Sequence, residues 1–367
     1  MGGARSLTRR QSSIKGLVVQ ETNAGLVGQV VDIIATTRPL NGAVGTASLL
    51  GDIGPQMTTA FEEAQRLVEF RYPDWGGGDI TLSFGDKYSS KDGGSAGAAM
   101  TLLMISIIDR FDIDPTIAMT GDISVDGKVR KIGALNAKVR GAILDHAAIV
   151  AIPEENAPQI DDIMLLQNDD APWSIQIVSI ATIDQAIALA RTDRDPAMAE
   201  ALELFKSLQE DRAAHKGGSL GDPKTAEKLE KVVKLLPGHQ SAKSLLQMAR
   251  HQSPRTLTVE STLAELGVLL SSLEPSDVIA RIKNGTATRQ DAMELRSHCL
   301  QISRMAAPET RRLMNAANEY AGLVADAYNA GKLDAGLLRK LDDSLNQLYA
   351  QLDAIGSNKQ ILEQLIR

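Results

Sequence analysis

A nearly unbroken apolar run, residues 98–108, is the feature that most constrains how this chain can fold. A helix that is apolar on every face must be buried all round, so the run predicts a central helix rather than a surface one. The segment Lys91–Gly97 (Lys-Asp-Gly-Gly-Ser-Ala-Gly) precedes it and places Ser95 at the helix N-terminus. First-turn amides lack intrahelical acceptors. Ser95 therefore fits two interpretations: a helix cap or anion-binding loop, or a nucleophile beside amides able to hold an oxyanion.

A serine nucleophile needs a base, and the sequence points to no histidine partner. The five histidines are scattered: His146, His215, His239, His251 and His298. A lysine can serve where burial keeps it neutral, because desolvation lowers its pKa. Residues 132–143 predict a turn leading into a helix, with Leu135, Val139, Ala142 and Ile143 on its buried face and Lys138 at the flank. A solvated surface lysine is the alternative interpretation of Lys138.

Four ordered segments resemble the proteolytic domain of Lon proteases, a family that uses a Ser-Lys dyad and no histidine. Residues 91–97 resemble its Lys-Asp-Gly-Pro-Ser-Ala-Gly loop, and residues 118–123 (Ala-Met-Thr-Gly-Asp-Ile) resemble its Met-Thr-Gly-Glu segment. Residues 127–138 are similar to Gly-x-Val-x-x-Ile-Gly-Gly-Leu-x-x-Lys, and residues 152–156 to Ile-Pro-x-Glu-Asn. The separation of Ser95 from Lys138 equals that of the family's dyad.

The resemblance covers roughly residues 14–192. Upstream it is weaker and rests on expected strands at 16–19 and 31–35, a helix at 60–68 and a strand at 80–84. It implies an α+β Lon-type proteolytic domain, followed here by an all-α C-terminal domain.

The resemblance also implies the site. Ser95 is the expected nucleophile, Lys138 its base, and Thr120 the residue that orients the lysine. Asp92 is either a regulatory group beside the site or an aspartate that satisfies loop amides. Lys91 is expected to be a solvated loop lysine. Gly93 and Gly94 of the same loop are expected to have supporting roles.

Several positions depart from the family pattern. Gly94 stands where the family has proline. The glycine loosens the backbone before the nucleophile and restores an amide N–H. Ala134 replaces a glycine and Asp122 a glutamate, while Asn136 and Ala137 replace a charged pair. None of these changes removes the dyad, so hydrolytic chemistry is expected.

Composition shifts divide the chain into four parts. Residues 1–13 are expected to form a mobile N-terminal arm, and 14–195 the Lon-like domain. Residues 196–224 read as a connecting helix and a linker, with the flexible part from 210, because glycines and a proline cluster there. Residues 225–367 predict an all-helical domain, with a weak tetratricopeptide-like hairpin near 225–250.

Apolar spacing predicts the helices of that last part. They are expected at Thr225–Leu236, Ser241–Arg250, Ser261–Leu273, Ser276–Asn284, Arg289–Met305, Glu309–Asn329 and Ala335–Leu365, the last broken near Gly356. The final helix carries a leucine stripe that favours bundle packing, with a dimerisation or docking face as the alternative. The stripe consists of Leu338, Leu341, Leu345, Leu348 and Leu352.

Motifs and segments that the sequence lacks exclude further classes of function. No Gly-x4-Gly-Lys-Ser/Thr phosphate loop occurs, and Gly76–Gly78 reads as a turn, so the chain is not expected to unfold substrates itself. A net charge of −7 argues against nucleic acid as a main partner. No apolar run is long enough to span a membrane. Cys299 is the only cysteine, and neither a metal nor another cofactor is expected.

The sequence therefore predicts an ATP-independent or partner-dependent serine endopeptidase that cleaves unfolded or exposed polypeptide through an acyl-enzyme. Its expected partners are polypeptide substrates and a separate unfoldase or adaptor, and the resemblance suggests a homo-oligomer. A cytoplasmic location is expected, with the periplasm as the alternative if a signal peptide was removed. The competing interpretation is a non-hydrolytic Lon-like scaffold or interaction module.

Overall fold

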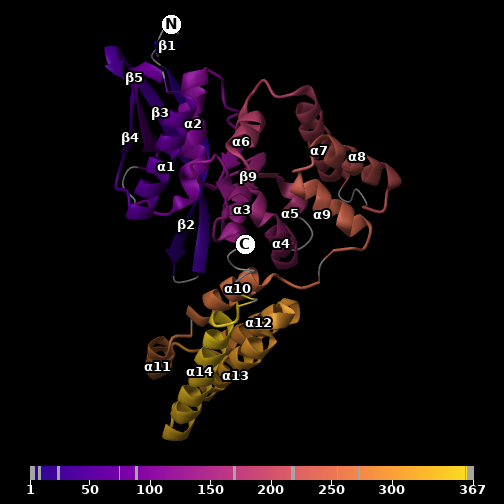
Figure 1. The fold of residues 1–367 in the computed structure, drawn as a ribbon. Helices are drawn as coiled ribbons and strands as arrows, with labels where there is room; N and C mark the ends of the chain where they lie inside the picture. Colours follow the sequence, from indigo (N-terminus) through magenta and orange to yellow (C-terminus); the bar gives the residue numbers. More distant parts are fainter. Residues whose placement is uncertain are drawn as a thin grey trace. The chain divides into compact units, whose positions relative to one another are not determined.

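A computed structural model, drawn in Figure 1, gives the fold of the chain. It describes residues 5–6, 10–22, 25–73, 75–86, 90–167, 171–215, 220–253, 255–271, 273–359 and 361. The chain divides into two compact units. The first comprises residues 1–20 and 27–253, and the second comprises residues 21–26 and 254–367.

The first unit is built on an eight-stranded mixed sheet. Its strands are β1 (Arg5–Ser6), β2 (Gln11–Thr22), β3 (Gly25–Val44), β4 (Thr46–Leu50), β5 (Trp75–Phe84), β6 (Ile117–Met119), β9 (Ile149–Pro153) and β10 (Gln176–Ile180). They lie in the order β1-β5-β3-β2-β6-β9-β10, and β4 also pairs with β5. The β3–β5 pair is antiparallel, whereas β2, β6, β9 and β10 pair in parallel. A separate antiparallel pair, β7 (Asp122–Ile123) and β8 (Val129–Arg130), follows β6.

Helices cover this sheet, and the most deeply buried one is the predicted central helix. They are α1 (Pro55–Arg71), α2 (Gly97–Asp109), α3 (Leu135–Leu144), α4 (Ile160–Gln167), α5 (Ala171–Ser174), α6 (Ile183–Ala190), α7 (Pro196–His215), α8 (Pro223–Leu235) and α9 (Gln240–Ala249). Every residue of α2 from Gly97 to Ile108 is buried, and α1 and α6 pack against it (Figure 1). The prediction from the apolar run is confirmed.

The glycine run at Gly76–Gly78 was expected as a turn, and that expectation is wrong. These glycines lie inside β5, opposite β3, where the register shifts between the Pro39–Gly78 and Val44–Gly76 pairs. Glycines inside a strand often mark such an irregularity, because the bulged backbone needs room that side chains would occupy.

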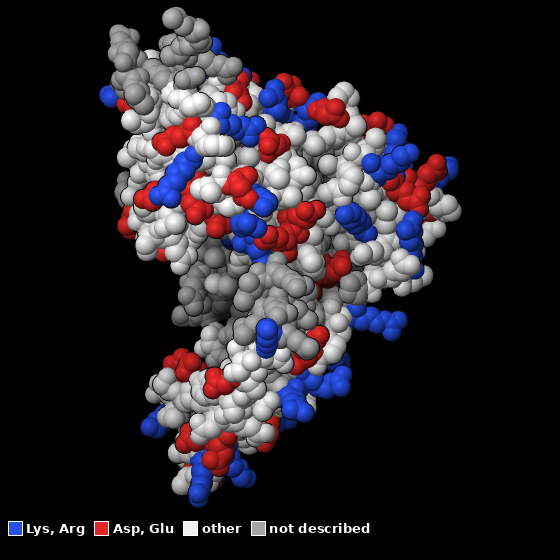
Figure 2. All heavy atoms as spheres, viewed as in Figure 1, with Lys and Arg blue, Asp and Glu red and all other residues white. Residues whose placement is uncertain are grey.

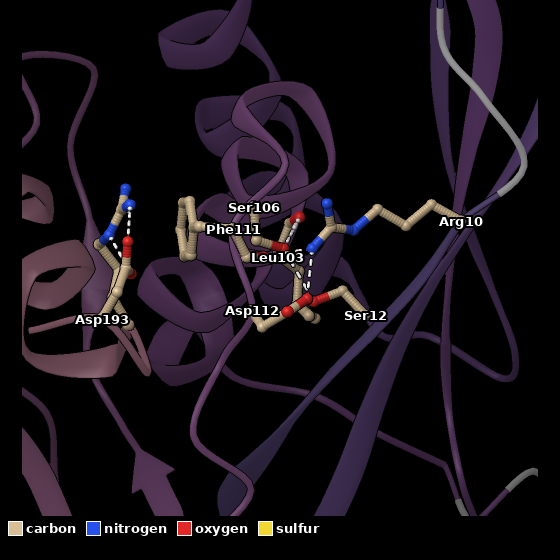
Figure 3. A network of polar contacts seen from close by, with 8 residues as sticks. Arg10, Ser12, Leu103, Ser106, Phe111, Asp112 and Asp193 are labelled. Atoms are coloured by element: carbon tan, nitrogen blue, oxygen red, sulfur yellow. Dashed lines mark hydrogen bonds and ion pairs between the residues drawn. The ribbon is translucent and has the colours of Figure 1, made fainter.

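Part of the predicted N-terminal arm pairs with the sheet. Arg5–Ser6 pair with β5, and β2 begins at Gln11. Figure 3 shows Arg10 reaching from the start of β2 to the loop after α2. Its guanidinium donates to the Phe111 carbonyl at 2.7 Å and to Asp112 Oδ1 at 2.6 Å. The rest of the predicted arm, residues 1–4 and 7–9, lies outside the described residues.

The predicted linker is helical at both of its ends. Helix α7 runs to His215 and α8 begins at Pro223, so helix replaces part of the flexible segment expected from residue 210. Residues 216–219 lie outside the described part. Helices α7 to α9 belong to the first unit, and Phe205, Leu229 and Leu245 enter its core. The tetratricopeptide-like hairpin α8–α9 is thus part of the same unit, and its helix α9 packs on β10.

From residue 255 on, the described residues of the second unit form only helices and the loops between them, whereas residues 21–22 and 25–26 belong to β2 and β3. The helices are α10 (Val259–Ser271), α11 (Pro275–Lys283), α12 (Arg289–Met305), α13 (Arg311–Ala330) and α14 (Ala335–Gly356). They share one apolar core, in which Leu341 and Leu348 of the leucine stripe are buried and Leu345 and Leu352 partly so. The all-α prediction is confirmed. No helix in the described ranges is long and apolar enough to cross a membrane.

Candidate active site

The serine loop connects the sheet to the buried helix. After β5 the chain reaches Gly93, whose φ of 97° only glycine adopts readily. One 3-10 turn follows, Gly94–Ala96, and Gly97 opens α2. Ser95 is half-buried in this turn, at the N-terminal end of α2 as predicted.

Lys138 contacts the serine directly. Its Nζ lies 2.7 Å from Ser95 Oγ and 3.2 Å from Thr120 Oγ1. Thr120 Oγ1 in turn donates to the Ser95 carbonyl at 3.3 Å. Lys138 is 3% exposed and Thr120 is 0% exposed. The structure therefore brings the three predicted residues together and excludes the solvated alternative for Lys138.

Burial sets the charge state of the lysine. Desolvation lowers the pKa of Lys138 to about 8, because a low-dielectric surrounding disfavours the ammonium form. A base with a pKa close to neutral can both accept and return a proton during a reaction. The geometry and the pKa together suit Lys138 to deprotonate Ser95.

Close backbone packing positions the helix that carries the lysine. A Cβ added at Gly141 of α3 would lie 2.4 Å from the carbonyl carbon of Gly28 in β3. A Cβ at Gly28 would lie 1.8 Å from the Ala137 oxygen. Only glycines permit this approach of α3 to the sheet. No local pattern in the sequence indicates this contact, because it joins residues far apart in the chain.

The Ile-Pro-x-Glu-Asn segment holds the turn before that helix. Asn156 is 0% exposed and pairs with both backbone groups of Ile132, accepting from its amide at 3.0 Å and donating to its carbonyl at 2.9 Å. Glu155 accepts from the Lys131 amide at 2.9 Å. The turn ends at Ala134, whose φ of 57° is left-handed. The sequence indicates this motif but not its structural role, which is to fix the turn before the Lys138 helix through hydrogen bonds to the Lys131 and Ile132 backbone.

Asp92 and Lys91 lie away from the dyad contacts. The Asp92 carboxylate accepts from the amides of Gln56 at 2.9 Å and Met57 at 3.1 Å, at the first turn of α1. Hydrogen bonds from the Gly93 and Met57 amides lower the pKa of Asp92. These contacts fit the interpretation of Asp92 as an aspartate that satisfies backbone amides. The expectation of a solvated Lys91 is wrong: it is 8% exposed, its Nζ pairs with Asp86 at 3.1 Å, and its backbone forms a β-bridge with Ile53.

Across the described ranges, no cluster of three or more histidine, cysteine, aspartate or glutamate side chains is arranged to hold a metal ion. The hydrogen bonds to Ser95 come from the Thr120 hydroxyl, the Lys138 amine and the Gly121 amide.

A serine hydroxyl hydrogen-bonded to a buried lysine is the arrangement found in the Ser-Lys class of hydrolases. Comparison with known proteins identifies the family. The chain belongs to the family of the Lon protease (S16) C-terminal proteolytic domain, whose model matches residues 6–192.

Curated relatives agree with this family. The chain is 32% identical over 167 residues to the Lon protease of Trichlorobacter lovleyi, covering 44% of this chain and 20% of the relative. It is 29% identical over 171 residues to the Lon protease of Rickettsia bellii, covering 46% and 22%. It is 30% identical over 170 residues to that of Rhizobium meliloti, covering 44% and 20%. The chain thus spans about a fifth of the length of these relatives.

Proposed function

We propose that this chain is a serine endopeptidase in which Ser95 is the nucleophile and Lys138 the general base. The observation that carries the proposal is the 2.7 Å hydrogen bond between Ser95 Oγ and the buried Lys138 Nζ. Membership of the Lon proteolytic family supports the same chemistry.

In the acylation half, neutral Lys138 accepts the Ser95 proton while Oγ attacks the carbonyl carbon of a peptide bond. The resulting oxyanion is held by the Ser95 amide and a neighbouring loop amide, which lie in the first turn of a short helix. Lys138 then gives its proton to the departing amine, leaving an ester on Ser95. Thr120 keeps the lysine aligned through its contact with Nζ.

In the deacylation half, Lys138 takes a proton from water as that water attacks the ester. The carboxyl product leaves, and Oγ recovers a proton from the lysine. The same amine therefore serves both halves of the reaction, which requires a pKa near the working pH. A Lys138 pKa of about 8 meets that requirement.

The substrates we propose are unfolded or exposed polypeptide segments. The sequence contains no phosphate-loop motif, so cleavage by this chain proceeds without ATP, or a separate unfoldase or adaptor delivers folded clients. A homo-oligomer is the assembly expected from the family. On the face drawn in Figure 2, basic and acidic side chains intermingle over each unit, in keeping with a polypeptide rather than a nucleic-acid partner.

Cleavage of casein and of a fluorogenic unstructured peptide tests this function. Wild type and the Ser95→Ala and Lys128→Met variants are compared, with and without ATP. Lys128 is an exposed lysine on the β7–β8 turn, so its replacement is a matched control. We expect cleavage by wild type and Lys128→Met in both conditions, and none by Ser95→Ala. Equal cleavage by Ser95→Ala would assign the activity to another residue or a contaminant, and no cleavage by any form would favour the scaffold interpretation.

A further inference from the structure

Asp122 packs against the serine loop, on the two glycines that flank Ser95. A Cβ added at Gly94 would lie 3.0 Å from Asp122 Cγ, 3.0 Å from its Oδ1 and 3.1 Å from its Oδ2. A Cβ added at Gly97 would lie 3.3 Å from Asp122 Oδ1. The carboxylate therefore borders the space that a side chain at position 94 would enter.

The Asp122 side chain is itself fixed. Its Oδ1 accepts from the Ile123 amide at 2.8 Å. The preceding residue, Gly121, donates to the Ser95 carbonyl at 2.8 Å and accepts from the Ala98 amide at 3.0 Å. Three consecutive residues thus contact the site. The Thr120 side chain contacts Lys138, and the Gly121 backbone contacts Ser95. The Asp122 carboxylate packs on Gly94.

These contacts bear on a departure from the family. Where Lon proteases have proline, which fixes φ, this chain has the freer Gly94. Where they have glutamate, it has the shorter Asp122. An aspartate packed against a glycine can restrict the loop by contact with a neighbouring segment. It would then replace the proline ring, which restricts the backbone of the loop itself.

We propose that Asp122 is a positioning residue, whose carboxylate packs on Gly94 and holds Ser95 Oγ on Lys138 Nζ. This inference rests on the proposed function for its kinetic consequence. Shape rather than charge carries the effect, because the charged groups that act on Asp122 are Glu63 and Arg130, not the catalytic lysine. Position 94 and position 122 form one coupled pair.

A double-mutant cycle on cleavage of the fluorogenic peptide tests the pair. Asp122→Ala empties the space beside Gly94, so we expect kcat to fall about tenfold at unchanged KM. Asp122→Asn keeps both the volume and the acceptor for the Ile123 amide, so kcat should stay within about twofold. Gly94→Ala alone should also lower kcat, because the new Cβ displaces the carboxylate. In the double variant the Cβ fills the vacated space, and kcat should exceed that of Asp122→Ala.

Two kinetic results would overturn the inference. One is a double variant whose loss equals the product of the two single losses, and the other is a loss in Asp122→Asn as large as in Asp122→Ala. Asp126→Ala is the matched control, because Asp126 lies on the same hairpin and bonds to Ser124 and Lys128 rather than to the loop. Its kcat should equal that of wild type.

Amide hydrogen exchange separates this inference from the proposed function. In the full chain carrying Ser95→Ala, the added change Asp122→Ala should speed exchange of the peptide covering residues 92–98, and Asp122→Asn should not. An unchanged exchange rate in Asp122→Ala would refute the positioning role. A wild type without peptidase activity would refute the proposed function. The hydrogen-exchange comparison would still test the positioning role of Asp122.

Discussion

Replacing the buried lysine by methionine should change stability in a strongly pH-dependent way. The pKa of Lys138 is about 8 in the folded chain, against about 10.4 for an unfolded lysine. The difference corresponds to about 3 kcal/mol. Below pH 8 both states carry the proton, and folding bears the whole cost of burying an ammonium group. Between the two pKa values the unfolded chain binds more protons, so wild-type stability rises with pH until that cost is gone.

Lys138→Met removes this cost and also removes the hydrogen bonds to Ser95 and Thr120, each about 1 kcal/mol. The variant should therefore be about 1 kcal/mol more stable than wild type at pH 7. Above pH 10.4 it should be about 2 kcal/mol less stable, because only the lost hydrogen bonds remain. The sign of the difference reverses.

Denaturant unfolding followed by tryptophan fluorescence measures this difference. The chain has two tryptophans, Trp75 and Trp173, and both are buried in the first unit. The signal thus reports the unit that holds Lys138. Other groups that titrate at high pH are common to both proteins and cancel in the difference. For Lys128→Met, an exposed control, the difference should not vary with pH. If the stability difference between Lys138→Met and wild type stays constant from pH 7 to about 10.5, the lowered pKa of the buried lysine is refuted.

Three further predictions concern the same site. In steady-state assays kcat/KM should rise about tenfold per pH unit up to about pH 8 and then level, because the neutral amine is the active form; a profile that levels near pH 6 would contradict a lysine base. Gly141→Ala should destabilise the first unit by about 3 kcal/mol in denaturant titration, since its Cβ would meet the Gly28 backbone. Gly133→Ala is the matched control, because nothing lies within 4 Å of its added Cβ. Ala134→Gly should raise stability by about 1 kcal/mol in the same titration by relieving a left-handed alanine, and a lower stability would argue against that strain.

Local signals in the sequence were strong wherever the chain has a periodic pattern or a motif. The nearly unbroken apolar run predicted α2 because only burial on all sides accommodates it. Helix α12 begins and ends at the predicted residues, and Thr288 caps its N-terminus. The family resemblance directed attention to Ser95 and Lys138, whose contact the spacing alone does not imply.

Other features depend on tertiary contacts that no local pattern encodes. Lys138 lies at the flank of the predicted buried face, and its burial comes from the way α3 docks on β3 through Gly141 and Gly28. The glycines at 76–78 carry ordinary turn chemistry, and strand pairing with β3 overrides it. Asp122 was noted only as a departure from a motif, because its contact with Gly94 crosses two separate segments.

The central claim is that Lys138 activates Ser95 as a nucleophile. Intact-mass spectrometry and peptide mapping after reaction with a fluorophosphonate, which phosphonylates activated serines, test it most directly. One adduct on Ser95 is predicted for wild type and for Lys128→Met, with none on Ser95→Ala or Lys138→Met. Labelling of Ser95 at the wild-type rate in Lys138→Met would contradict the claim, as would an unmodified Ser95 in the wild-type protein.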